Sequence, residues 1–118
     1  MTPSITFAEQ VEANLRLLVC RPEFGGNQLW LTFYLVGPPE NLQQISEDLK
    51  GRGWVNVEGW EGGFFYPKAQ VEKSPEAVVQ IAEATQKLCV SHDIEILNID
   101  ADTSPGVQPS HHVTLYQV

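Results

Sequence analysis

The chain has 118 residues, close to the commonest size of a single domain, and a hydrophobic content of 42% that is enough for one ordinary core. Fifteen acidic residues face seven basic ones, and the resulting net charge of -8 repels phosphate backbones, so direct binding of nucleic acid is not expected. No stretch approaches the roughly 20 apolar residues that cross a bilayer, so no membrane span is expected either.

The amino terminus and the cysteines indicate a cytoplasmic protein. Residues 1–4 lack the basic and apolar regions of an export signal. Cys20 and Cys89 stand in unrelated segments, so we expect two reduced thiols rather than a disulfide. No CxxC pattern or cysteine–histidine set indicates zinc, and no cofactor is predicted.

The first predicted element is a helix over residues 6–19. Thr6 and Glu9 have the spacing of a capping box, in which a hydroxyl and a carboxylate satisfy free backbone donors. The apolar residues of this segment then recur at helical spacing: Ala8, Val11, Leu15 and Leu18. A strand over 15–20 is the alternative, because Leu17, Leu18 and Val19 form an unbroken apolar run.

Residues 29–36 form the clearest strand. Large residues alternate on both of its faces, which predicts a central strand that is covered on part of each side. Residues 40–50 follow as a helix with Leu42, Ile45 and Leu49 on one face, and Gly51 or Gly53 provides its left-handed cap.

A hairpin is predicted next. Residues 54–60 alternate as a half-solvated second strand, residues 61–63 make the turn, and residues 64–66 begin the return strand. Pro67 cannot donate a ladder hydrogen bond, so the return strand is interrupted or lies at an edge, and it resumes near 69–71.

The carboxyl-terminal half begins with a strong helix start, in which Ser74 caps a helix that has proline at its first position. Residues 94–99 form a further strand, residues 103–110 a loop and residues 112–116 a short terminal strand. The predicted apolar stripe of the helix that Ser74 caps is Val78, Ile81, Thr85 and Leu88, with Ala77 and Ala84 beside it. The predicted core residues are Leu31, Phe33, Leu49, Val57, Ile81, Leu88 and Ile96.

This order of elements predicts an α+β fold, the ferredoxin-like split βαβ sandwich. Its antiparallel sheet carries two crossover helices on one face. We predict a single domain over residues 1–118, with a core at 28–101, an N-terminal helix at 6–19, and a C-terminal loop and strand at 102–118.

No set of residues indicates catalysis, so the chain is predicted not to be an enzyme. The histidines, His92, His111 and His112, form no metal set, because adjacent residues on a strand point to opposite faces. Asp100 and Asp102 are expected at the exit of the last strong strand. There they either present a ligand site or form a solvated acidic edge of the sheet.

Trp60 is the candidate binding residue. It stands beside a glycine-rich turn between Glu58 and Glu61, and an exposed tryptophan with an acidic rim is a plausible hot spot for a basic peptide. The alternative is that Trp60 folds over the end of the sheet as a plug.

From Ala8 to Asp100 the layout resembles the regulators of ribonuclease E activity of the B type. The resemblance lies in a leading helix at 9–19, a glycine-containing loop into 29–33, the sequence Gly53-Trp54-Val55 after the next helix, a hairpin, and a long helix into 90–95. It implies a ferredoxin-like domain that inhibits an RNA-processing nuclease. The best-known members carry a strongly acidic tail, whereas residues 110–118 here contain no acidic residue.

Two functions therefore stand as hypotheses. The first is a regulatory module that binds a protein with a basic segment, which the resemblance would make an RNA-processing nuclease. The alternative is a small-molecule sensor that binds its ligand at a strand end, and a homodimer formed through the sheet is compatible with it.

Overall fold

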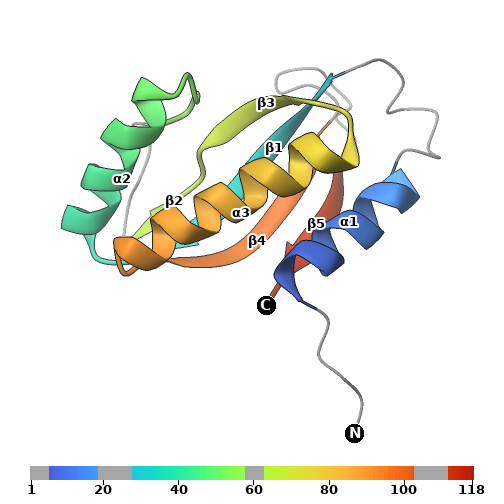
Figure 1. Cartoon of the computed structure of the whole chain (residues 1–118). Helices are drawn as coiled ribbons and strands as arrows, with labels where there is room; N and C mark the ends of the chain where they lie inside the picture. Colours follow the sequence, from blue (N-terminus) through green and yellow to red (C-terminus); the bar gives the residue numbers. More distant parts are fainter. Residues whose placement is uncertain (1–5, 19–27, 58–62, 103–111) are drawn as a thin grey trace, which may run out of the picture.

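The described part of the chain contains three helices and five strands (Figure 1). The computed structural model describes residues 6–18, 28–57, 63–102 and 112–118. The elements are, in chain order, α1 (Phe7–Leu18), β1 (Gln28–Val36), α2 (Pro39–Gly51), β2 (Phe64–Phe65), β3 (Lys68–Glu72), α3 (Pro75–Ser91), β4 (Glu95–Asp102) and β5 (His112–Gln117). The predicted first helix is therefore confirmed over its described residues, and the alternative strand is not formed there.

The strands form one antiparallel sheet with β1 at its centre. β2 and β3 both pair with one side of β1, β4 pairs with the other side, and β5 pairs with the outer side of β4. β2 and β3 follow one line along β1, because Leu35 lies opposite Phe65 and Thr32 lies opposite Lys68. The predicted interruption at Pro67 is confirmed. β1 thus lies between the two strands that α3 connects, which confirms the split βαβ arrangement.

The predicted second strand is wrong over its described residues, 54–57. Only Val55 pairs, in an isolated antiparallel bridge to Lys68. Asn56 has a left-handed backbone (φ 57°), which an extended strand does not accommodate, and its Nδ2 donates to the Tyr66 carbonyl at 2.6 Å. The rest of the predicted strand, 58–60, lies outside the described residues.

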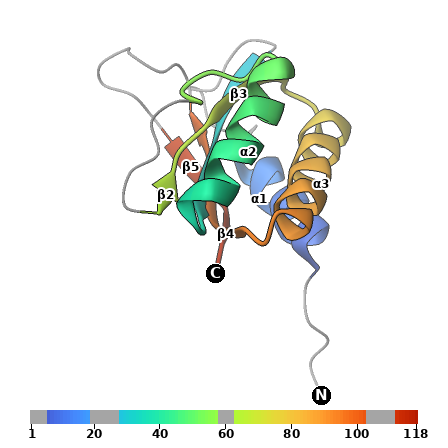
Figure 2. The same cartoon turned by 90° about the vertical axis from the view of Figure 1, so that its left-hand side faces the viewer.

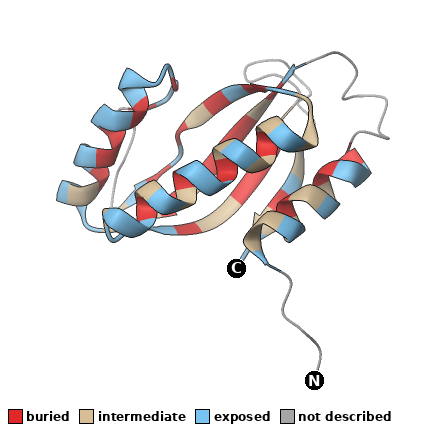
Figure 3. Ribbon diagram, viewed as in Figure 1, coloured by how far each residue is buried: buried red, intermediate tan, exposed pale blue. Residues whose placement is uncertain are grey.

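All three helices lie on one face of the sheet, as Figures 1 and 2 show together. The β1 side chains on that face, Leu29, Leu31, Phe33 and Leu35, are at most 1% exposed. Figure 3 shows buried segments on the sheet and on the helices that cover it. α1 packs beside α3 and over β5, where the rings of Phe7 and Tyr116 lie 4.7 Å apart. None of the described helices is long and apolar enough to cross a membrane.

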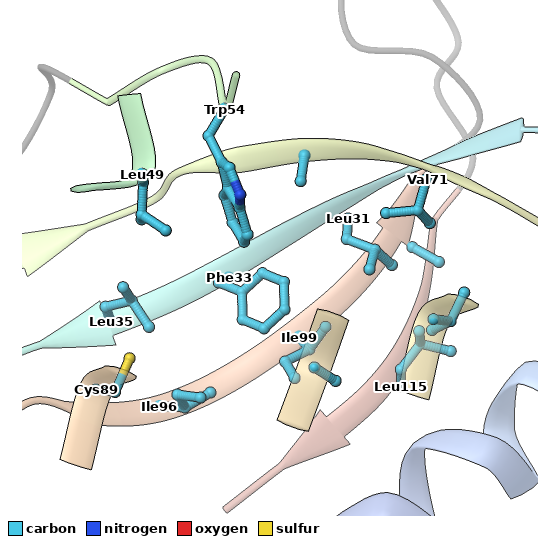
Figure 4. Close-up of a cluster of buried hydrophobic side chains, with 14 of the residues drawn as sticks. Leu31, Phe33, Leu35, Leu49, Trp54, Val71, Cys89, Ile96, Ile99 and Leu115 are labelled. Carbon is cyan, nitrogen blue, oxygen red and sulfur yellow. The ribbon is translucent and has the colours of Figure 1, made fainter. Parts of the chain in front are cut away.

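Five of the seven predicted core residues are buried: Leu31, Phe33, Leu49, Val57 and Ile96 (Figure 4 labels four of them). The other two, Ile81 and Leu88, are only half-buried at the margin of the core. The buried stripe of α3 is instead Val78, Ala82, Thr85 and Cys89. Both stripes have helical spacing and apolar members, so the contact with the sheet, which sequence spacing does not contain, decides between them.

The helix ends follow the sequence signals closely. The Glu9 N–H donates to Thr6 Oγ1 at 3.1 Å, but Thr6 Oγ1 itself donates to the Glu9 carboxylate, so only half of the predicted capping box forms. Ser74 Oγ accepts from the Ala77 N–H at 3.2 Å, which confirms the cap of α3. Gly53 has a φ of 86° after α2, as predicted for its left-handed cap.

Candidate functional site

The residues predicted as a partner site, Trp60, Glu58 and Glu61, lie outside the described residues, so their role stays a prediction. His111 lies outside them as well, as does the side chain of His112. His92 caps the carboxyl end of α3, where its carbonyl accepts from Asn41 Nδ2 at 2.8 Å. Within 6–18, 28–57, 63–102 and 112–118, no three histidine, cysteine or acidic side chains gather as metal ligands would.

Two concave surfaces stand out in the described part of the chain. The first, which we call the helix groove, runs between α1 and α3 and has a volume of about 550 Å³. Its lining consists of Glu12 from α1 and of Pro75, Glu76, Val79, Gln80, Glu83, Ala84 and Lys87 from α3. Figure 1 shows the two helices that form its walls.

The lining of the helix groove combines carboxylates with apolar side chains. It holds three carboxylates, those of Glu12, Glu76 and Glu83, and one ammonium group, that of Lys87, together with Pro75, Val79 and Ala84. Glu12 also accepts a 2.7 Å hydrogen bond from Arg16 on the same helix. Such a lining suits lysine or arginine side chains, whose aliphatic stems cover apolar atoms while their charged ends reach carboxylates.

The second concave surface lies on the sheet face opposite the helices, and we call it the sheet hollow. Its volume is about 490 Å³. Tyr34 and Tyr66 stand opposite each other on its wall, with ring centroids 5.1 Å apart and planes at 65°. The residues that line it are Tyr34, Phe64, Tyr66, Leu97, Asn98, Thr114, Gln117 and Val118.

The same face of the sheet also carries hydrogen-bonded polar side chains from β1, β3 and β4. Thr32 Oγ1 donates to Asp102 Oδ2 at 2.7 Å and accepts from Lys68 Nζ at 3.1 Å. Lys68 Nζ also lies 4.0 Å from Asp102 Oδ2. The same face holds Asp100, whose Oδ1 accepts from Asn98 Nδ2 at 2.6 Å.

The expectation of a solvated acidic edge at Asp100 and Asp102 is therefore wrong. β4 continues to Asp102, so Asp100 lies within the strand and Asp102 is its last residue. Asp100 is 8% exposed and Asp102 is half-buried. The sequence pattern does not show this burial, because Tyr34, Thr32 and Lys68, which interact with these carboxylates, come from β1 and β3, while Asn98 lies on β4 itself.

Two groups among the described residues have strongly raised pKa values. Burial, together with the charge of Asp100 and a hydrogen bond to it, raises the pKa of Tyr34 to about 12. Burial raises the pKa of the Cys89 thiol to about 12 as well. At neutral pH Tyr34 therefore remains a hydrogen-bond donor and Cys89 remains a thiol rather than a nucleophilic thiolate.

Comparison with protein-family models, with curated proteins and with solved structures finds no match to this chain. Function must therefore be inferred from the two concave surfaces and from the charge of the chain.

Sequence reasoning missed both surfaces. The sheet hollow had a signal in the sequence, because Tyr34 on β1, Phe64 on β2 and Tyr66 just after β2 alternate with core residues. That signal becomes a site only once the strands are paired in register. The helix groove left none, because nothing in the sequence indicates that α1 lies beside α3.

Proposed function

We propose that this protein is a non-enzymatic regulatory module that binds a basic segment of another protein in the helix groove. The observation that carries the proposal is a groove lining that combines three carboxylates, on Glu12, Glu76 and Glu83, with the apolar side chains of Val79 and Ala84. A basic segment laid along the groove would cover the apolar side chains with its aliphatic stems and bring its charges to the carboxylates.

The charge of the whole chain supports the same partner chemistry. A net charge of -8 attracts a basic segment over a Debye length or so and raises its association rate. The contacts with the apolar lining of the groove would then set the residence time. Trp60, with Glu58 and Glu61, remains a second predicted contact for the same partner.

The resemblance to the B-type regulators of ribonuclease E activity supports an RNA-processing nuclease as the partner. In this proposal the basic segment belongs to the nuclease, and binding lowers its activity. The chain would act on RNA only through this enzyme, since its own charge opposes contact with phosphates.

The test is a titration of the protein with basic segments of the ribonuclease E-type enzyme of the same organism, at 0.15 M salt. We expect the double variant Glu76→Lys, Glu83→Lys to weaken binding by about tenfold or more, mainly by slowing association. A matched control reverses the same number of charges on α2, at the exposed residues Glu40 and Glu47, and should bind within about threefold of the parent.

Equal weakening in both double variants would show that net charge alone attracts the segment and that the helix groove is not its site. Absence of binding by the parent would remove the nuclease as the partner. Added nuclease assays should show inhibition by the parent and by the α2 control, and less inhibition by the groove variant.

A further inference from the structure

Three aromatic rings line one side of the sheet hollow. Because Leu35 pairs with Phe65, Tyr34 and Tyr66 lie directly opposite each other and both project away from the helices. Their planes meet at 65°, and Phe64, on the same face, adds a third ring. Tyr66 and Phe64 remain 40% and 43% exposed, so much of their ring surface is free to contact a ligand.

A buried carboxylate lies next to these rings. Asp100 is 8% exposed, and its hydrogen-bond donors in the described part of the chain, the Asn98 amide and the Tyr34 hydroxyl, are both neutral. The nearest ammonium group on this face, that of Lys68, is directed to Thr32 and Asp102 instead. Thr114, which pairs with Asp100, and Asn98 both line the hollow, so the negative charge stands directly behind its wall.

We propose that the sheet hollow binds a methylated ammonium group. The faces of aromatic rings attract cations, most strongly those with little bound water, and several rings around one space are the usual receptor for quaternary ammonium. Asp100 adds the charge that such a cation needs. Leu97 and Val118 supply apolar surface for its methyl groups. The volume of about 490 Å³ lies within the range of about 300–1,000 Å³ that ligand sites occupy.

Other occupants fit this surface less well. A nucleotide base would stack on the rings, but its phosphates would meet Asp100, Asp102 and a net charge of -8. A neutral aromatic ligand would gain nothing from the buried carboxylate. The methylated ammonium group itself has two sources, a free small cation or a methylated lysine of another protein.

The experiment compares two probes of equal shape, choline and 3,3-dimethylbutan-1-ol, in which carbon replaces the charged nitrogen. The full chain is titrated with each and followed by NMR shifts of the Tyr34 and Tyr66 rings. We expect choline to bind at least tenfold more tightly than the neutral alcohol. A peptide with trimethyllysine is titrated beside its unmethylated form, and tighter binding of the peptide than of choline identifies a protein as the source.

Variants test the rings and the carboxylate separately. Tyr66→Leu should weaken binding of the cation by about tenfold, whereas Tyr66→Phe, which keeps the ring, should bind like the parent. Asp100→Asn, which keeps the shape and removes the charge, should reduce the preference for choline over the alcohol. Tyr66 is well exposed, so its variants remain informative even if Asp100→Asn does not fold.

The proposal is overturned if neither methylated probe binds, if choline and its neutral isostere bind equally, or if Tyr66→Leu binds like the parent. The site is independent of the proposed function, since it lies on the sheet face opposite the helices. The Glu76→Lys, Glu83→Lys variant should therefore bind choline as the parent does, and loss of one activity leaves the other intact.

Discussion

The ring of Trp54 packs against the ring of Phe33 with centroids 5.2 Å apart and planes inclined by 54° (Figure 4). This contact joins the turn after α2 to the middle of the central strand. The backbone N–H of Trp54 also donates to the Leu49 carbonyl at 3.1 Å, so the turn fixes where the indole enters the core.

Trp54→Ala should therefore destabilise the protein by about 3–5 kcal/mol, because it leaves a large cavity above Phe33. Trp30→Ala, on the opposite face of β1 where the indole is only half-buried, is the matched control and should cost less. Urea unfolding followed by circular dichroism measures both. Equal costs would mean that the indole of Trp54 does not fill the core.

The buried stripe of α3 is tested by adding volume at two alanines of the same helix. Ala82 is 0% exposed, whereas Ala84 is exposed. Ala82→Leu should cost about 1–3 kcal/mol because the core has no room for it, and Ala84→Leu should change the free energy of unfolding by less than about 0.5 kcal/mol. Thermal or urea unfolding measures both costs. A larger cost for Ala84→Leu than for Ala82→Leu would favour the stripe predicted from the sequence.

Gly51 and Gly53 offer a second matched pair, since an added Cβ meets no atom within 4 Å at either position. Gly51 ends α2, so Gly51→Ala should stabilise the protein by about 0.5–1 kcal/mol. Gly53 has a φ of 86°, and Gly53→Ala should cost about 1–2 kcal/mol from backbone strain alone. The melting temperature measures both variants. If it shifts in the same direction in both, the difference in backbone conformation between Gly51 and Gly53 is contradicted.

The raised pKa of Tyr34 predicts a loss of stability at alkaline pH. Its pKa is about 12 in the folded protein, against 10.0 for a tyrosine without these contacts, so the folded state holds the phenol proton more tightly. The titration of Tyr34 therefore leaves the free energy of unfolding unchanged below about pH 10 and lowers it as the pH rises from about 10 through 12. Tyr34→Phe should show a shallower decline over this window. Parallel pH profiles of the melting temperature for parent and variant would disprove the shift.

Cys89 should react slowly with thiol reagents in the folded state, because its side chain is 1% exposed and its pKa is about 12. A Cys20→Ser variant leaves Cys89 as the one thiol for measurement. At pH 8 its alkylation by iodoacetamide should be at least tenfold slower than in urea. A rate in the native protein that equals the rate in urea would show that this thiol is accessible.

The sequence by itself determined which segments of this chain are helices and strands in nearly every case. Ser74 caps α3 and Gly53 forms the left-handed turn that follows α2, because the donors, carbonyls and backbone angles involved lie within a few residues of one another. The alternation of large residues on both faces of β1 likewise predicts a central strand, and the order of elements was enough to predict the split βαβ sheet.

Only the tertiary structure decided how these segments face one another. It selected Ala82 and Cys89 rather than Ile81 and Leu88 as the buried side of α3, and it reduced the expected second strand to one bridge at Val55. Strand register placed Tyr34 opposite Tyr66, and helix packing brought Glu12 to Glu76 and Glu83. Strand register and helix rotation depend on residues far away in the chain. Local spacing fits more than one choice of buried face equally well, so it does not determine them.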